Sequence, residues 1–321
     1  MTMWTALKEP FAAKEQRAVF VETLQELIDR NPRVVALEAD LGGASGFSKI
    51  KKSHPAHFVQ VGISEANMIG VAAGMSLRGY IPFVHTFAPF VARRACDQLY
   101  MAGAYSKNTI NVFASDPGVC AATNGGTHTA FEDLGFIRAL PDALVFDPAD
   151  GVQLNWLLHE LVDRTGIHYV RTTRKDIRPI YKPGSTFEIG KGNILTAGKD
   201  VLLLAMGELL GEALDAAARL QQAGISTEVI DMFTIKPLDR DLILQEASGK
   251  KLIVTCENHS VINGLGSAVA DVIAEAALNI PLRKVGIQDR FGQVGSLKYL
   301  KQTYGLTAEH IQSVVQDHFS A

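Results

Sequence analysis

Apolar residues recur along the chain with two alternating spacings. Residues 14–29 place apolar side chains at Val19, Phe20, Leu24 and Leu27, and steps of three and four residues predict an amphipathic helix. The same alternation of short apolar runs and helical periods predicts strands at residues 33–37, 81–85, 109–114, 143–146 and 168–171, with helices at residues 68–75, 90–105, 131–139 and 152–162. Strands that alternate with helices predict an α/β fold with a mainly parallel sheet covered on both faces.

Residues 174–188 interrupt this alternation. They contain Pro179 and Pro183 among charged residues and show little apolar periodicity, as connections between domains do. We therefore predict two domains, residues 12–185 and residues 186–321. In the second domain the alternation resumes, with strands predicted at residues 201–205, 227–231 and 251–256 and helices at residues 212–222, 239–247 and 308–318.

Composition narrows the class of protein. The 321 residues are 47% hydrophobic and 20% charged, which suits two globular α/β domains. A net charge of −3 argues against nucleic acid or an anionic membrane as a general partner. The three cysteines form no C-x-x-C motif and indicate neither a disulfide framework nor a zinc site. Because residues 1–10 contain no apolar targeting segment and no later run is long enough to span a membrane, we expect a cytoplasmic protein.

Residues 57–68 join a buried strand to a helix through Gly62. The helix continues through small and apolar residues to Met75, so its backbone can lie close to a sheet. Glu65 falls in the first helical turn, with Ser64 as the expected cap. On local grounds an acidic residue here simply complements the helix dipole.

Two glycine-containing turns are candidates for binding sites. Gly264-Leu265-Gly266 lacks the third glycine of a dinucleotide fingerprint, so we interpret it as a tight turn that starts a helix. The loop Asn124-Gly125-Gly126-Thr127-His128 follows the strand predicted at residues 109–114, and loops at strand ends often build sites. Taken alone, however, a loop histidine is more often solvated than catalytic.

Several short motifs together identify a family. Each is weak singly, but their order and spacing resemble the pyrimidine-binding domain of transketolase. The motifs are Ala39-Asp40-Leu41, Gly62-Ile63-Ser64-Glu65-Ala66-Asn67-Met68, Thr86-Phe87-Ala88-Pro89-Phe90, Gly126-Thr127-His128, Arg138-Ala139-Leu140-Pro141 and Pro148-Ala149-Asp150. Residues 231–237 and Glu257-Asn258-His259 resemble the transketolase C-terminal domain. The resemblance runs from about Lys14 to the end and implies these two domains in this order.

The resemblance implies a thiamine diphosphate site. In this family a glutamate at the position of Glu65 hydrogen-bonds the aminopyrimidine ring, which makes Glu65 both a catalytic and a cofactor-binding residue. Phe87 and Phe90 match the aromatic positions that pack on that ring. Asp40 matches a residue near the cofactor, and Arg93 stands where the cofactor pocket has a tyrosine.

The same comparison implies the substrate residues. Arg17 and Arg174 match two arginines that bind the phosphate of a sugar, and His128 matches a catalytic histidine near the reacting oxygens. Asn124 replaces an aspartate that contacts sugar hydroxyls, and Asp116 stands where a phosphate-contacting histidine is expected. We therefore predict transfer of a two-carbon ketol unit from a ketose, phosphorylated or otherwise modified, to an aldose.

Half of such a site is missing from this sequence. Thiamine enzymes hold the diphosphate through a metal bound at a G-D-G motif, and the chain has no G-D-G. Because that motif lies in the preceding domain of a full-length transketolase, the resemblance implies the second subunit of a split transketolase. We expect Mg²⁺ or a similar metal to be bound by a partner carrying the N-terminal section, in an α2β2 heterotetramer.

Three alternatives share parts of this pattern. The β subunit of a 2-oxo-acid dehydrogenase has the same size and domain pair, but the Thr-His loop and residues 148–150 favour transketolase. The C-terminal half of a deoxyxylulose-phosphate synthase is normally fused to its own diphosphate domain. A non-catalytic regulatory subunit of the same fold is disfavoured because the chain keeps Glu65, His128, Arg17 and Arg174.

Overall fold

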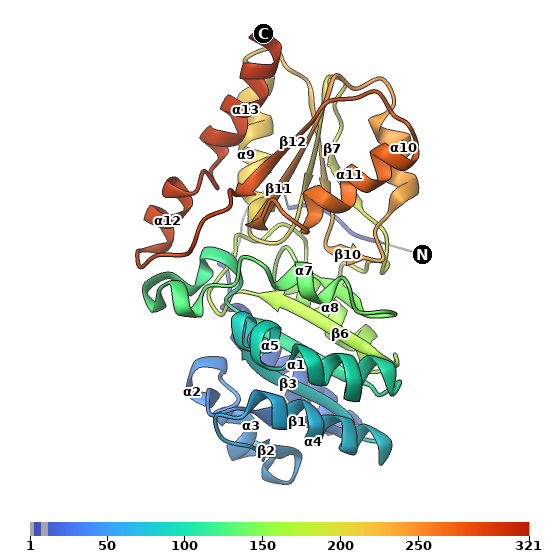
Figure 1. Cartoon of the computed structure of the whole chain (residues 1–321), viewed down its shortest axis with the longest axis vertical. Coiled ribbons are helices and arrows are strands. Elements are labelled where there is room, and N and C mark those ends of the chain that lie inside the picture. The colour runs from blue at the N-terminus through green and yellow to red at the C-terminus, as the bar shows by residue number, and fades with distance from the viewer. Residues whose placement is uncertain (1–2, 8–11, 321) are drawn as a thin grey trace.

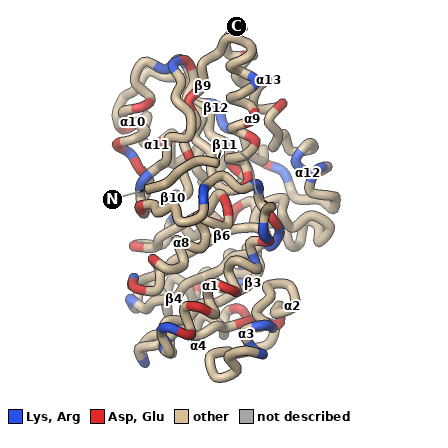
Figure 2. The backbone as a smooth tube through the Cα atoms, turned by 180° about the vertical axis from the view of Figure 1, so that it is seen from behind, with Lys and Arg blue, Asp and Glu red and all other residues tan. Residues whose placement is uncertain are grey.

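The computed structural model describes residues 3–7 and 12–320, so part of the stretch considered for a targeting signal lies outside the described residues. The chain forms two α/β domains, as predicted, and these are stacked along the long axis of the molecule (Figure 1). In the described part of the chain no helix is long and apolar enough to cross a membrane. Lys and Arg are interspersed with Asp and Glu over both domains (Figure 2).

The first domain is built on a seven-stranded sheet in the order β10-β5-β6-β4-β3-β1-β2. Every neighbouring pair is parallel except β10 with β5. The strands are β1 (Val34–Glu38), β2 (Phe58–Gln60), β3 (Ile81–Phe87), β4 (Ile110–Ser115), β5 (Leu144–Phe146), β6 (Ile167–Thr172) and β10 (Thr234–Lys236). Strands β1, β4 and β6 are buried at every residue, because helices cover both faces of the sheet.

The helices of this domain divide between the two faces of the sheet. On one face Phe20 packs in the same apolar cluster as Phe83, whereas Met68 packs with Val84, the next residue of β3, on the other face. The helical segments are α1 (Gln16–Arg30), α2 (Gly42–Ser45), α3 (Ser48–Ser53), η1 (Pro55–His57), α4 (Glu65–Leu77), α5 (Ala88–Arg94), α6 (Cys96–Gln98), η2 (Leu99–Tyr105), η3 (Gly118–Asn124), η4 (Gly126–His128), α7 (Asp133–Ile137) and α8 (Gly151–Leu161).

Three local expectations are wrong. The strand predicted before Gly62 to be buried is β2, which lies at the edge of the sheet and is only partly buried. Ser64 precedes α4 but its side chain makes no capping hydrogen bond. The single helix predicted at residues 90–105 is divided, because Ala95 leaves helical geometry at φ −124° and the last seven residues form the π-helix η2. In η2, Gly103 lies so close to β6 that a Cβ would be 2.6 Å from the Cδ1 of Ile167, so any larger residue would require the end of the Ile167 side chain to move.

The second domain is built on a five-stranded sheet in the order β12-β11-β8-β9-β7, parallel except for β7 beside β9. Its elements are β7 (Asn193–Thr196), β8 (Val201–Ala205), α9 (Leu209–Gln222), β9 (Thr227–Asp231), α10 (Arg240–Ala247), β11 (Leu252–Ser260), α11 (Leu265–Glu275), β12 (Leu282–Ile287), α12 (Leu297–Thr303) and α13 (Ala308–Ser320). No helix or strand lies between β6 and β7, the segment in which we place the domain boundary.

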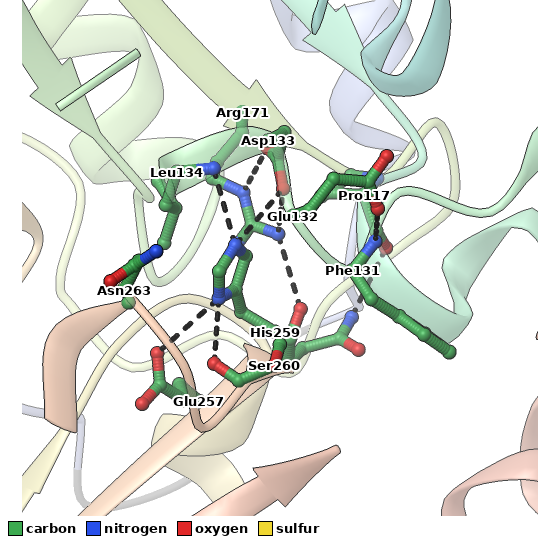
Figure 3. A network of polar contacts seen from close by, with 12 residues as sticks. Pro117, Phe131, Glu132, Asp133, Leu134, Arg171, Glu257, His259, Ser260 and Asn263 are labelled. Carbon is green, nitrogen blue, oxygen red and sulfur yellow. Dashed lines mark hydrogen bonds and ion pairs between the residues drawn. The ribbon is translucent and has the colours of Figure 1, made fainter. Parts of the chain in front are cut away.

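A buried polar network joins the two domains (Figure 3). The fully buried guanidinium of Arg171, from β6, pairs with Asp133 at 2.9 Å and Asp147 at 2.7 Å and donates to the backbone oxygen of Asn258 in β11 at 3.1 Å. Burial lowers the pKa of His259 to about 4, so its neutral ring can accept the Leu134 N–H at 3.2 Å. Through this contact strand β11 fixes the start of α7, which follows the Thr-His loop in the sequence.

The Gly264-Leu265-Gly266 turn is filled by the protein itself. Both oxygens of the Glu257 carboxylate are used, accepting from Leu265 N at 2.7 Å and Gly266 N at 2.8 Å. A Cβ at Gly264 would lie 1.9 Å from the nearer of these oxygens. The prediction of a helix-starting turn rather than a phosphate site is therefore confirmed, since a carboxylate already occupies the helix N-terminus.

Candidate active site

Five neighbouring strands of the first sheet end at one edge, because all five are parallel. In open α/β sheets this carboxyl edge is where ligands bind. The predicted site residues follow the strands in spatial order, namely Arg174 after β6, Asp116 after β4, Phe87 at the end of β3, Asp40 after β1 and Glu65 after β2. The topology of the sheet therefore brings together residues that are far apart in sequence.

An aromatic cluster lies at the centre of this edge. The rings of Phe87 and Phe90 have centroids 5.7 Å apart, and the His128 ring approaches them edge-on at 5.8 and 5.2 Å. The guanidinium carbon of Arg174 lies 4.8 Å from the Phe87 centroid, and that of Arg94 lies 4.0 Å from the Phe90 centroid. The two aromatic side chains are thus flanked by a cation at each end.

Glu65 is the first residue of α4, and only 4% of its surface is exposed. Its Oε1 accepts from Arg94 Nη1 at 2.9 Å, whereas its Oε2 makes no hydrogen bond to any described residue. The sequence analysis placed Glu65 at the start of a helix but missed this guanidinium. A signal was present, because Arg94 follows Phe90 by four residues and therefore lies on the same face of α5.

Arg17 and Arg174 lie side by side, with Arg17 N donating to Arg174 O at 3.4 Å. Each arginine is held by a carboxylate. Asp116, only 2% exposed, accepts from Arg174 N at 2.7 Å and Nε at 2.5 Å. Glu15 accepts from Arg17 Nε at 2.8 Å, and this hydrogen bond lowers the pKa of Glu15. Asp116 therefore anchors a predicted substrate arginine.

Three of the predicted site residues take no part in the contacts described above. The Asp40 backbone N donates to the Gln60 side chain at 2.9 Å, which also accepts from Gly62 N, so Gln60 ties two loops of the site together. Asn124 is exposed, and its side chain makes no hydrogen bond to a described residue. Arg93 donates to Glu132 at 2.5 Å and to Thr129 O at 2.8 Å, and so braces the loop that carries His128.

Three buried side chains beneath the carboxyl edge of the sheet are joined by hydrogen bonds, and the sequence analysis did not predict them. Glu38 contacts His85 Nδ1 at 3.0 Å, and His85 Nε2 contacts Ser115 Oγ at 2.9 Å, all three being fully buried. Glu38 also accepts from Leu41 N at 3.0 Å. These hydrogen bonds link the ends of β1, β3 and β4. They thereby fix the backbone at the positions of Asp40, Phe87 and Asp116.

The two halves of the chain match two family models. The transketolase pyrimidine-binding domain matches residues 13–179, and the transketolase C-terminal domain matches residues 190–311. The chain belongs to the transketolase family. This confirms the resemblance drawn from the short motifs, including the order of the two domains.

Relatives of this transketolase-family chain include both short and long proteins. The chain is 40% identical to 6-deoxy-6-sulfo-D-fructose transketolase subunit SqwH of Clostridium sp. strain MSTE9, covering 95% of this chain and 96% of that subunit. Human transketolase is 35% identical over 94% of this chain but only 48% of its own length. A solved split-gene transketolase, described as an inactive β4 tetramer, superposes with a TM-score of 0.87 at 38% identity, covering 96% and 99% of the chains.

The residues present fit one part of the family's cofactor. Two phenylalanine rings and a carboxylate oxygen that accepts no hydrogen bond from the described residues suit a flat ring that carries a hydrogen-bonding nitrogen, which describes an aminopyrimidine. Among the described residues no group of three or more His, Cys, Asp or Glu side chains could hold a metal ion. The fit thus concerns the ring rather than the diphosphate.

Proposed function

We propose that this chain is one subunit of a thiamine-diphosphate-dependent transketolase that moves a two-carbon ketol unit from a ketose to an aldose. The observation that carries the proposal is the cluster of Glu65, Phe87, Phe90 and His128 at the carboxyl edge of a transketolase-family sheet. The partner is an N-terminal-section subunit that supplies the diphosphate and Mg²⁺ ligands in an α2β2 assembly. The inactive β4 tetramer of a related split-gene chain supports this need for a partner.

The cofactor, when bound, supplies the carbanion nucleophile that the side chains of a protein cannot provide. With Oε1 held by Arg94, Glu65 would offer Oε2 to the ring nitrogen of the cofactor and would hold a proton there. Phe87 and Phe90 pack on the ring and exclude water. Because Thr127 Oγ1 contacts His128 Nδ1 at 2.9 Å, Nε2 is the ring nitrogen left to hydrogen-bond the oxygens of the donor.

We propose that the preferred donor carries a terminal sulfonate. Arg17 and Arg174 each have their positive charge opposed by a carboxylate, Glu15 and Asp116, so the field for a dianion is weakened. A sulfonate carries one negative charge, whereas a phosphate monoester carries up to two near neutral pH. The 40% identical subunit named for 6-deoxy-6-sulfo-D-fructose supports this class of donor, and the neutral amide of Asn124 is consistent with a departure from ordinary sugar phosphates.

The test is reconstitution. The chain is co-expressed with the N-terminal-section protein of its own organism, and transfer to an aldose phosphate is measured with 6-deoxy-6-sulfofructose or fructose 6-phosphate as donor, with and without thiamine diphosphate. We expect cofactor-dependent transfer that is faster from the sulfonate. If the purified complex transfers no ketol unit from either donor, the proposed function is wrong; faster transfer from the phosphate would reject the sulfonate preference alone.

A further inference from the structure

We infer that Arg94 is a positioning residue for Glu65. By holding Oε1 of the Glu65 carboxylate it leaves Oε2 to meet the ring of the cofactor. This inference rests on the proposed function, because the role of Glu65 is assigned there. Arg94 is not part of any of the family motifs. The inference follows from two contacts that the Arg94 guanidinium makes.

The first contact is the ion pair itself. Arg94 Nη1 lies 2.9 Å from Glu65 Oε1, and Glu65 is almost fully buried although half of the Arg94 side chain is exposed. A buried carboxylate without a partner is costly, so this pair differs from a surface salt bridge, whose two ends are both solvated. The ion pair Glu160–Arg164, with side chains 41% and 45% exposed, is an example of the ordinary kind in this chain.

The second contact fixes the guanidinium. Its carbon lies 4.0 Å from the centroid of Phe90, so the planar group rests on the ring while one nitrogen reaches Glu65. Phe90 in turn packs against Phe87 and His128. The carboxylate is therefore tied through Arg94 to the same aromatic cluster that would hold the cofactor ring. A lysine could supply the charge but not the flat, multiply hydrogen-bonding surface.

A double-mutant cycle separates positioning from a general structural effect. The assembled complex is prepared with wild-type chain, Glu65→Gln, Arg94→Met, the double mutant and Arg94→Lys. The dissociation constant of thiamine diphosphate with Mg²⁺ is measured by calorimetry, and exchange of the cofactor C2 proton for deuterium is measured by NMR. Glu160→Gln and Arg164→Met form the matched control pair, and unfolding curves confirm that each variant is folded.

We expect Glu65→Gln and Arg94→Met each to weaken cofactor binding about tenfold, the loss of roughly one charge-assisted hydrogen bond. In the Glu65→Gln background Arg94→Met should add less than about twofold, because no charged oxygen remains to be positioned. Arg94→Lys should be intermediate and both control variants should match wild type.

Equal effects of Arg94→Met in both backgrounds would overturn the inference, since Arg94 would then act independently of Glu65. So would wild-type affinity and exchange in Arg94→Met. If Arg94→Met fails to assemble, Arg94→Lys decides the same comparison. A different failure points to the proposed function instead: if Glu65→Gln itself leaves both affinity and exchange unchanged, the role assigned to Glu65 is wrong whatever Arg94 does.

Discussion

Asp116→Asn should change the preference of the enzyme between a sulfonate and a phosphate donor. Asp116 is 2% exposed and holds Arg174 by its backbone N at 2.7 Å and its Nε at 2.5 Å. An asparagine keeps the shape and can still accept one of these bonds, but it removes one negative charge from the arginine subsite. If Arg17 and Arg174 bind the terminal anion of the donor as proposed, the positive field that meets this anion is stronger in the variant.

The expected magnitude follows from the charge difference between the donors. A phosphate dianion carries one more negative charge than a sulfonate, and at an assumed separation of roughly 7 Å with an effective dielectric of about 20, one unit charge contributes about 2 kcal/mol. The ratio of kcat/KM for the phosphate donor over the sulfonate donor should thus rise roughly 30-fold. Unfolding free energy should fall by about 1.5–3 kcal/mol, because a charge-assisted hydrogen bond is lost.

The assay is competition between 6-deoxy-6-sulfofructose and fructose 6-phosphate in one reaction, which gives the ratio of the two kcat/KM values directly. Glu15→Gln is the matched control. It removes the carboxylate that pairs with Arg17, but Glu15 is 37% exposed, so its effect should stay within about fivefold. An unchanged ratio in a folded Asp116→Asn complex would refute the claim that Asp116 sets the charge preference.

Three other predictions concern Asn124, cofactor binding without the partner, and Glu257. Asn124→Asp should raise kcat/KM for ordinary ketose phosphates relative to the native donor, because a carboxylate accepts charge-assisted hydrogen bonds from sugar hydroxyls; steady-state kinetics with both donors would show the change. The chain without its partner should give no saturable heat with thiamine diphosphate and Mg²⁺ in calorimetry. Burial raises the pKa of Glu257 from 4.5 to about 7, so its contribution to stability is present below pH 4.5 and lost as pH rises through 7. Glu257→Gln should remove about 3 kcal/mol of that pH dependence in denaturant unfolding at pH 4.5 to 8, and parallel curves for mutant and wild type would contradict this.

The central strands could be predicted from the sequence because a strand buried on both faces consists almost entirely of apolar residues. This is why residues 33–37, 109–114 and 201–205 correspond to β1, β4 and β8 within one residue at each end. Strands β7, β10 and β12 lie at the sheet edges and were missed. Strand β10 is three residues long and comes from the second half of the chain, so its pairing with β5 depends on contacts that a local pattern does not contain.

Strand ends and short motifs predict candidate site residues at one edge of the sheet. The structure connects five of them by contacts, namely Glu65, Phe87, Phe90, His128 and Arg174. The partners of these residues were not predicted, because each partner is distant in sequence or was assigned another role. Asp116 was predicted only as a residue at the position of a phosphate-contacting histidine, whereas its two oxygens are hydrogen-bonded to Arg174.

The carboxyl edge of the sheet carries one ion pair near each of its two ends, and the two pairs have opposite arrangements of charge. At the β2 end a cation, Arg94, compensates the buried Glu65, and at the β6 end the anion Asp116 compensates Arg174. The Arg94 guanidinium rests on Phe90 and that of Arg174 rests on Phe87, and these two rings pack against each other. Each functional charge is thus held in place by an opposite charge, so the orientation of the carboxylate and the strength of the anion subsite can be altered separately. The variants at Arg94 and Asp116 should accordingly affect cofactor affinity and donor preference independently, whereas a shared effect on both would mean that the aromatic cluster couples the two ends.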